Sequence, residues 1–317
     1  MNTIRRRSAS VTMALALGAG CFPVSRAAAQ PAALAQRTFA SPEEAVKALR
    51  AAVAVHDKAA LREIFGPDVK DLLTGDEAQD KANSLRFAKT IEEGAKPVPE
   101  GEGKVVLEIG AKQWPFPIPL VKENAAWRFD TAAGKEEIID RHIGKDELHA
   151  IGVCSIYVQA QKQYASLERG ANGPRGYARK FMSGPGKMDG LYWKTGPSQV
   201  PSPFELKAAE AGVVDGGARG TKPFHGYFFK ILIRQGAAAP GGEQDYVKDG
   251  NLTVGFALAA YPEHWGRSGI MTFIVNQDGK IYQRDLGEQT ARLAPEIDAY
   301  DPDGGWTPVK DQGVLEK

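Results

Sequence analysis

Three side chains that could bind a metal ion follow one another in the middle of the chain, at His142, Asp146 and His149. The spacing i, i+4, i+7 places them within about 60° of one another on a helix. Imidazole and carboxylate are ligands that zinc accepts. However, the histidines lack the i, i+4 spacing of zinc proteases, and no third histidine completes that motif. The pattern therefore favours a solvated or capping edge of the helix over a metal site.

A cysteine lies in the same predicted helix. The stretch 146–165, DELHAIGVCSIYVQAQKQYA, is amphipathic, and Cys154 shares a face with Ala150 and Tyr157. Apolar surroundings raise the pKa of a thiol and make it inert. We therefore expect Cys154 and Tyr157 to be structural core residues.

Carboxylates gather in two later segments. The stretch DAYDPDGG contains Asp298, Asp301 and Asp303, and DYVKDGN contains Asp245 and Asp249. Hard oxygen ligands in turns suit calcium, although neither segment follows the EF-hand pattern. The alternative is ordinary turn chemistry. The candidate calcium ligands are Asp298, Asp301 and Asp303, and we expect no other cofactor.

A third candidate site is the exposed cluster of His264, Trp265 and Arg267. Such side chains bind a glycan or a peptide through stacking and hydrogen bonds. The alternative is a loop in which Trp265 covers the core.

Nucleophilic and nucleotide-binding motifs are absent from the sequence. The chain has no Gly-x-Ser-x-Gly or Ser-x-x-Lys motif, and GPGKMDG lacks the Walker spacing. Hydrolysis by a carboxylate pair stays open, because acidic residues lie in or beside the predicted β region. These are Glu243, Asp245, Glu263 and Asp278.

The first 29 residues have the layout of a secretory signal peptide. Arg5, Arg6 and Arg7 precede an apolar run over 11–20, and small residues follow. The run is too short to span a bilayer. We expect cleavage after Ala29 and a periplasmic or secreted protein. The alternatives are twin-arginine export and a lipoprotein anchored through Cys21.

Removal of residues 1–29 takes away four basic and no acidic residues, so the formal net charge changes from +1 to −3. A mixed, slightly acidic surface has no electrostatic footprint for nucleic acid. The expected partner is an envelope protein or a glycan. We expect no transmembrane segment after signal cleavage.

The elements that must position these residues form two predicted units. After a flexible lead-in over 30–37, residues 38–133 form a small α+β domain. Its first helix is capped by Ser41 with Glu44, and its second by Asp57. A third helix is predicted over 77–94. Period-two patterns then predict three short antiparallel strands, over 104–110, 114–123 and 125–133.

Residues 134–317 form the second predicted unit. It begins with the long helix, over about 134–167, and continues with a Gly-rich loop over 168–224 that includes a short helix at 204–211. The remainder predicts a four-stranded antiparallel meander. Its last hairpin turns at Asp278-Gly279, because Asp-Gly between alternating hydrophobic residues favours a tight turn.

Four stretches together resemble a bacterial secreted family known as domain of unknown function 2950. They are IGKDELHAIGVCSIYVQAQKQYA, YARKFMSGPGKMDGLYW, HGYFFKILIRQG and YPEHWGRSGIMTFIVNQDGKIYQRDLG. The resemblance covers essentially the whole mature chain and implies no established activity.

Two further resemblances concern fold. The first unit, with D-x-x-A-L, F-x-P-D and W-R-F-D, is similar to the cone-shaped nuclear-transport-factor-2-like superfamily. The second, with a long helix, G-Y-F-F and V-N-Q-D-G, resembles the globular head of type IV pilins and type II secretion pseudopilins. It has neither their prepilin-peptidase site nor their long apolar N-terminal helix.

The expected function is a non-catalytic binding or assembly module of the cell envelope. One alternative is an envelope hydrolase with a carboxylate-based site. The other is a pseudopilin-like secretion component.

Overall fold

The computed structural model describes residues 36–72, 77–167, 176–195, 200–204, 209, 212–213 and 223–310. The predicted signal peptide with Cys21, and most of the predicted helix at 204–211, lie outside these residues. The described chain is α+β, as predicted, and has two large hydrophobic cores, one in each unit. None of its helices combines the length and the apolar character needed to cross a membrane.

The first unit begins with the helices that the capping signals predicted. The Ser41 hydroxyl accepts a hydrogen bond from the Glu44 amide, and the Glu44 carboxylate accepts one from the Ala40 amide. Asp57 accepts from two amides at the start of the second helix. These bonds satisfy amides that the first turn of a helix leaves unpaired. The helices are α1 (Pro42–Ala54), α2 (Lys58–Phe65), η1 (Pro67–Leu72) and α3 (Glu77–Glu93).

An antiparallel sheet packs against these helices, in the order β1-β2-β4-β5 with β3 beside β2. β1 was not predicted from the sequence, and β3 and β4 were predicted as a single strand. Pro117 and Pro119 lie between those two strands, where they cannot donate to a strand ladder. The strands are β1 (Ala95–Pro99), β2 (Lys104–Ile109), β3 (Trp114–Pro115), β4 (Leu120–Glu123) and β5 (Ala126–Phe129).

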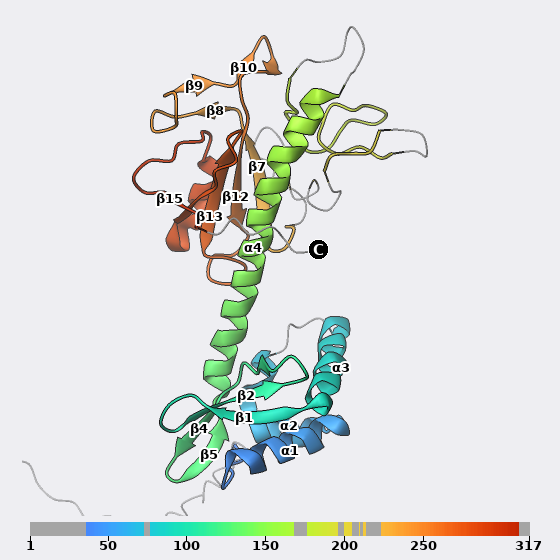
Figure 1. Cartoon of the computed structure of the whole chain (residues 1–317), viewed down its shortest axis with the longest axis vertical. Helices are drawn as coiled ribbons and strands as arrows, with labels where there is room; N and C mark the ends of the chain where they lie inside the picture. Colours follow the sequence, from blue (N-terminus) through green and yellow to red (C-terminus); the bar gives the residue numbers. More distant parts are fainter. Residues whose placement is uncertain are drawn as a thin grey trace, which may run out of the picture.

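Helix α4 (Thr131–Ser166) joins the two units, and Figure 1 shows it running from one to the other. Its first turns belong to the first unit: the Thr131 hydroxyl donates to the Phe65 carbonyl, and Arg141 donates to the Pro115 carbonyl. Its later turns lie against the second sheet, where the Tyr157 hydroxyl donates to the Ala257 carbonyl. One helix therefore contributes to both units.

The second sheet has the order β15-β14-β13-β12-β7-β6. Its centre is the predicted four-stranded meander, which two short edge strands extend; β6 pairs with β7 in parallel. β12 is buried along its whole length, because α4 packs on the sheet and Ala294 packs with Tyr261. The strands are β6 (Gly212–Val213), β7 (Tyr227–Leu232), β12 (Ala257–Pro262), β13 (Met271–Asn276), β14 (Tyr282–Asp285) and β15 (Thr307–Pro308).

Smaller elements complete the second unit. The predicted hairpin is confirmed, with Gly279 at φ +79° between β13 and β14. The smaller elements are β8 (Arg234–Gln235), β9 (Gln244–Asp245), β10 (Val247–Lys248), β11 (Asn251–Leu252), η2 (Gly287–Gln289), α6 (Thr290–Leu293) and η3 (Ala294–Glu296).

Two glycines of α4 give a matched test of its packing on the first unit. A Cβ at Gly134 would lie 2.5 Å from Ile118 Cγ1 and 3.0 Å from Ile118 Cα, whereas a Cβ at Gly144 would have no atom within 4 Å. We expect Gly134→Ala to lower the free energy of unfolding by about 1–3 kcal/mol through overpacking. Gly144→Ala should raise it by about 0.5–1 kcal/mol through helix propensity. Urea unfolding followed by circular dichroism measures both, and equal stabilities would contradict the close approach.

Candidate functional site

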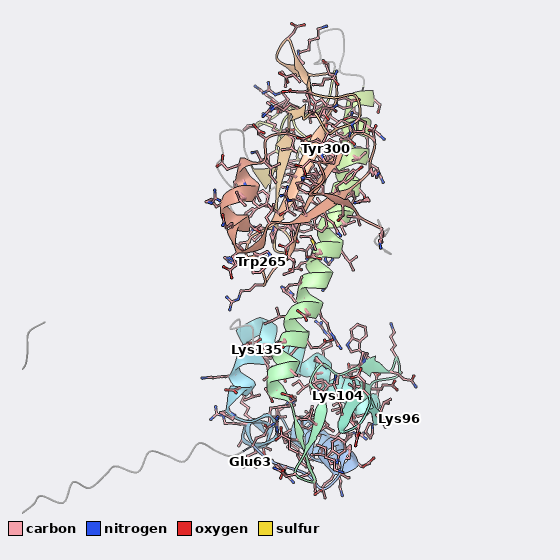
Figure 2. The ribbon with its side chains drawn as sticks, turned by 90° about the vertical axis from the view of Figure 1, so that its left-hand side faces the viewer. Glu63, Lys96, Lys104, Lys135, Trp265 and Tyr300 are labelled. Atoms are coloured by element: carbon pink, nitrogen blue, oxygen red, sulfur yellow. The ribbon has the colours of Figure 1, made fainter. Side chains whose placement is uncertain are left out.

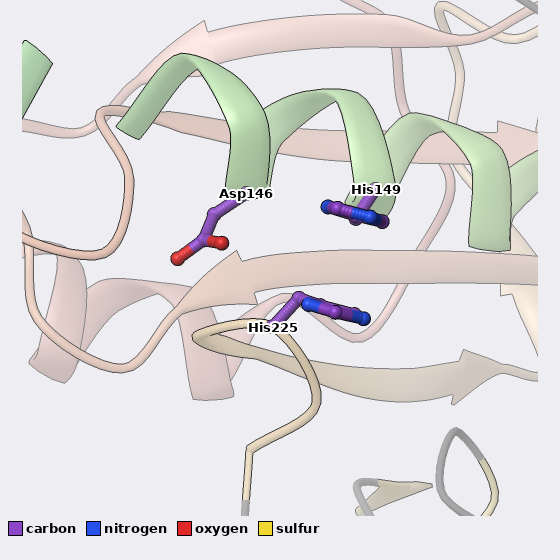
Figure 3. A group of neighbouring side chains, drawn as sticks. All are labelled: Asp146, His149 and His225. Carbon is purple, nitrogen blue, oxygen red and sulfur yellow. The ribbon is translucent and has the colours of Figure 1, made fainter. Parts of the chain in front are cut away.

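Three segments meet around the middle of α4. They are the α4 turns over 142–149, the turn over 224–227 that leads into β7, and the loop over 263–270 between β12 and β13. Asp146, His149 and His225 each offer a ligand atom, and these atoms all lie within 4.8 Å of one another. Figure 3 shows Asp146 and His149 on the helix and His225 on the turn facing them. We call these three residues, with His142, the Asp146 site.

Asp146 and His149 are spaced i, i+3, so α4 presents them on one face. Asp146 is only 3% exposed, and His142 Nε2 lies 3.2 Å from its Oδ2. His149 Nδ1 lies 2.8 Å from the Lys145 carbonyl oxygen. Because a carbonyl can only accept, Nδ1 carries the proton, and in the neutral ring Nε2 keeps its lone pair.

His225 reaches the helix from a two-residue turn. Phe224 and Tyr227 exchange backbone hydrogen bonds of 3.0 and 3.1 Å, and His225 and Gly226 between them have φ values of +46° and +68°. Positive φ at both central positions is the mark of a type I′ turn, which favours Asn-Gly. Residues other than glycine rarely adopt positive φ, although histidine does so more often than most of them.

Gly226 is required where it stands. A Cβ there would lie 2.8 Å from Asp146 Oδ2 and 2.6 Å from Ser268 Cβ. The turn, the helix and the loop over 263–270 therefore pack against one another at the carboxylate. The loop start is fixed as well, because the Glu263 amide donates to the Gly226 carbonyl over 2.8 Å.

The imidazoles of His149 and His225 stack face to face, with ring centroids 3.8 Å apart and planes 5° from parallel. Their nitrogens thus lie side by side near the carboxylate (Figure 3). A further carboxylate, that of Glu147, accepts from the Ile270 and Met271 amides and ties this part of α4 to the start of β13. These bonds hold the helix beside the loop that contributes to the site.

Asp146 is costly to ionise in the folded protein. Burial raises the pKa of its carboxyl, and electrostatic interactions with His142, His149 and Lys145 lower that pKa only in part. A perturbed carboxyl beside imidazoles can bind a cation, bind a polar ligand or exchange a proton.

Sequence analysis identified part of this site. His142, Asp146 and His149 were expected on one helix edge. The structure confirms the helix and shows in addition a contact between His142 and Asp146. The edge is not simply solvated, because Asp146 is buried. His225 was missed, because its place beside His149 depends on how a turn from a distant segment packs on α4.

The candidate calcium ligands have separate partners. Asp298 Oδ2 accepts from Arg234, Asp301 Oδ1 accepts from the Ala238 amide, and Asp303 Oδ1 accepts from the Gly305 amide. Among the described residues, three such carboxylates do not gather within ligand distance of one another here. Calcium binding at this loop stays a prediction.

The cluster of His264, Trp265 and Arg267 lies on the loop over 263–270, and Figure 2 shows Trp265 at the end of the second unit that faces the first. His264 and Arg267 are exposed, whereas Trp265 is half-buried and donates to the Asp285 carboxylate over 2.8 Å. Trp265 therefore ties its loop to β14. Binding of a glycan or peptide by this cluster stays a prediction.

Cys154 and Tyr157 are fully buried in the second core, where sequence analysis expected them. Burial raises the pKa of the Cys154 thiol to about 12 and raises the pKa of Tyr157 as well. Tyr157 also accepts a hydrogen bond from Gln161, whose amide group pairs with both the N–H and the C=O of Ala178. Both residues are therefore part of the packed core of the second unit.

Comparison with known protein families shows the family to which the chain belongs. A family profile described as "Protein of unknown function (DUF2950)" matches residues 36–309, which confirms the first resemblance seen in the sequence. No curated protein and no solved structure matches significantly, so the resemblances to nuclear-transport-factor-2-like domains and to pilin heads are not confirmed.

The buried thiol predicts a reactivity test. At mildly alkaline pH, iodoacetamide should leave Cys154 unmodified in the native protein and alkylate it in urea, because a thiol with a pKa of about 12 is almost entirely protonated. Mass spectrometry of the peptide that contains Cys154 reads out the result. Rapid alkylation of the native protein would show that the thiol is accessible.

The raised pKa of Asp146 predicts how stability depends on pH. A carboxyl whose pKa is raised by folding favours its neutral form, so the folded state loses stability as pH rises from the unfolded value, about 4, through the raised one. With a chelator present, Asp146→Asn should therefore gain stability relative to the wild type as pH rises.

Asp189 provides the control of opposite sign. Hydrogen bonds from Lys180 and from the Gly184 amide lower the pKa of its carboxyl despite desolvation, so it stabilises the fold above its unfolded pKa. Asp189→Asn should lose stability relative to the wild type as pH rises. Urea unfolding at several pH values measures both variants, and parallel curves would contradict the assignment.

Proposed function

Because the chain belongs to the DUF2950 family, whose description names no reaction, we propose its role from the geometry of the site. The protein is an exported, non-catalytic binding module of the cell envelope. Its ligand is a small species held at the Asp146 site, where α4 meets the turn over 224–227 of the second unit.

The observation that supports this proposal is that the residues of the site lower the stability of the fold when no ligand is bound. Asp146 is buried with a raised pKa, and His225 has a backbone conformation that a side chain rarely adopts. An unfavourable backbone and a buried carboxyl each oppose folding, and such features cluster at functional sites. Packing alone does not require either residue, since Asn favours the turn and an uncharged side chain suits the buried position.

Binding is favoured over hydrolysis by the state of the nearby nucleophiles. The Cys154 thiol is buried with a raised pKa, and the Ser268 hydroxyl both accepts from the His264 amide and donates to the His264 carbonyl. Neither group is paired with a histidine ring in the described part of the chain. The carboxyl of Asp146 is suited to proton transfer, which keeps a carboxylate-based hydrolase as the second candidate.

A measurement that needs no knowledge of the ligand tests the proposal. The protein is purified as it is exported, and its melting temperature is compared with that of the same sample after unfolding, dialysis and refolding. Loss of a bound ligand should lower the melting temperature by about 3 °C or more. The filtrate released on unfolding should restore it.

Two variants of α4 complete this experiment. Asp146→Asn should show the same melting temperature before and after refolding, because its site binds no ligand. Asp140→Asn, at an exposed position of the same helix, should behave as the wild type. An unchanged wild-type melting temperature after refolding would refute the binding function.

Export is tested separately on the N-terminal sequence. In a Gram-negative host, the full chain should be recovered by osmotic shock with Gln30 as its first residue, because the run over 11–20 is hydrophobic and small residues precede the cleavage point. Replacing both Leu15 and Leu17 by Arg should hold the uncleaved chain in the cytoplasm. A membrane-bound product linked through Cys21 would instead support the lipoprotein alternative.

A further inference from the structure

We infer that the ligand of the Asp146 site is a divalent transition-metal ion of the zinc type, bound by Asp146, His149 and His225. This inference rests on the proposed binding function and names the class of ligand. Two imidazoles and one carboxylate form the three-ligand set of open zinc sites. Calcium and magnesium prefer oxygen ligands alone, so the histidines select against them.

Helix α4 places two of the three ligands on the same face, as in other metal sites built on helices. A carboxylate and a histidine at i, i+3 both point to the same side of α4, and the same arrangement recurs in metal-binding helix bundles. The third ligand comes from a distant segment, which the turn at His225-Gly226 holds against the helix. An ion bound here would therefore join the turn to α4.

Hydrogen bonds around the ligands favour metal binding. The bond of His149 Nδ1 to the Lys145 carbonyl leaves Nε2 available as a ligand and fixes the ring orientation. His142 Nε2 lies 3.2 Å from Asp146 Oδ2 and orients the carboxylate. In metal sites, groups hydrogen-bonded to the ligands fix the histidine tautomer and orient the carboxylate in the same way.

A small rearrangement brings the three groups onto one ion. Ligand atoms on a tetrahedral zinc ion lie about 3.4 Å apart, as follows from bonds of about 2.1 Å, and here they lie within 4.8 Å. The stacked rings must also tilt, because an imidazole binds a metal ion in its own plane. His225 is exposed, so rotation of its side chain allows this without disturbing the core. Three protein ligands then leave one position for water or a substrate.

A matched pair of histidine variants tests the inference. His225→Asn removes the imidazole and keeps a residue that type I′ turns favour, so the variant should fold. His56 is also an exposed histidine with positive φ, at +53°, but it lies in the first unit away from the site. His56→Asn is therefore the control, and circular dichroism checks that both variants are folded.

The untagged proteins are titrated with Zn²⁺ in competition with a coloured chelator. The wild type and His56→Asn should bind one ion with affinities within about twofold of each other, and His225→Asn should bind at least about tenfold more weakly. Excess Ca²⁺ should not displace the ion. Equal zinc affinity in His225→Asn and the wild type would overturn the inference.

The filtrate experiment separates failure of this inference from failure of the binding function. If passage over a chelating resin abolishes the ability of the filtrate to restore the melting temperature, the ligand is a metal ion. If the treated filtrate still restores it and Zn²⁺ does not bind, the binding function stands and the metal is refuted. If no filtrate restores it, the binding function itself fails.

Discussion

The continuity of α4 is the constraint on which the rest of the structure depends. The first turns of this helix pack against Phe65 and Ile118 of the first unit, and its later turns cover the sheet of the second, so both units are attached to the same rod. At one end, the absence of a side chain at Gly134 lets the helix lie on Ile118. At the other, Gln161 pairs with the backbone of Ala178 and holds the following segment to the helix. The Asp146 site occupies the turns between these two anchors.

Local signals in the sequence predicted most elements, because their causes are local. Ser41 and Asp57 satisfy amides of their own helices, and Asp278-Gly279 turns its own hairpin. The missed features depend on distant partners. β1 contains Pro97 and Pro99 and is a strand only because β2 pairs with it, and the edge strands of the second sheet are two residues long. Such segments are too short or too rich in proline to show the alternation of apolar and polar residues that predicts a strand.

The candidate site shows the same division. The spacing of His142, Asp146 and His149 is visible in the sequence, since it follows from the period of one helix. That Asp146 is buried, and that His225 stacks on His149, depends on how a turn from another segment docks on α4. Helical periodicity cannot report that contact. The sequence therefore predicted the right helix edge and the wrong environment for it, and the carboxylate became informative only when its burial was known.

A rigid connection through one helix also fixes the rotation of one unit relative to the other about the helix axis. α4 has 36 residues, which correspond to a rod about 54 Å long at about 1.5 Å per residue. Inserting one residue between the anchors of the two units would lengthen the rod by only about 1.5 Å but turn one unit by about 100° relative to the other. Insertions of about seven or eleven residues, close to two or three full turns, nearly restore the original orientation. Length variation in related chains should therefore concentrate in loops and spare this helix.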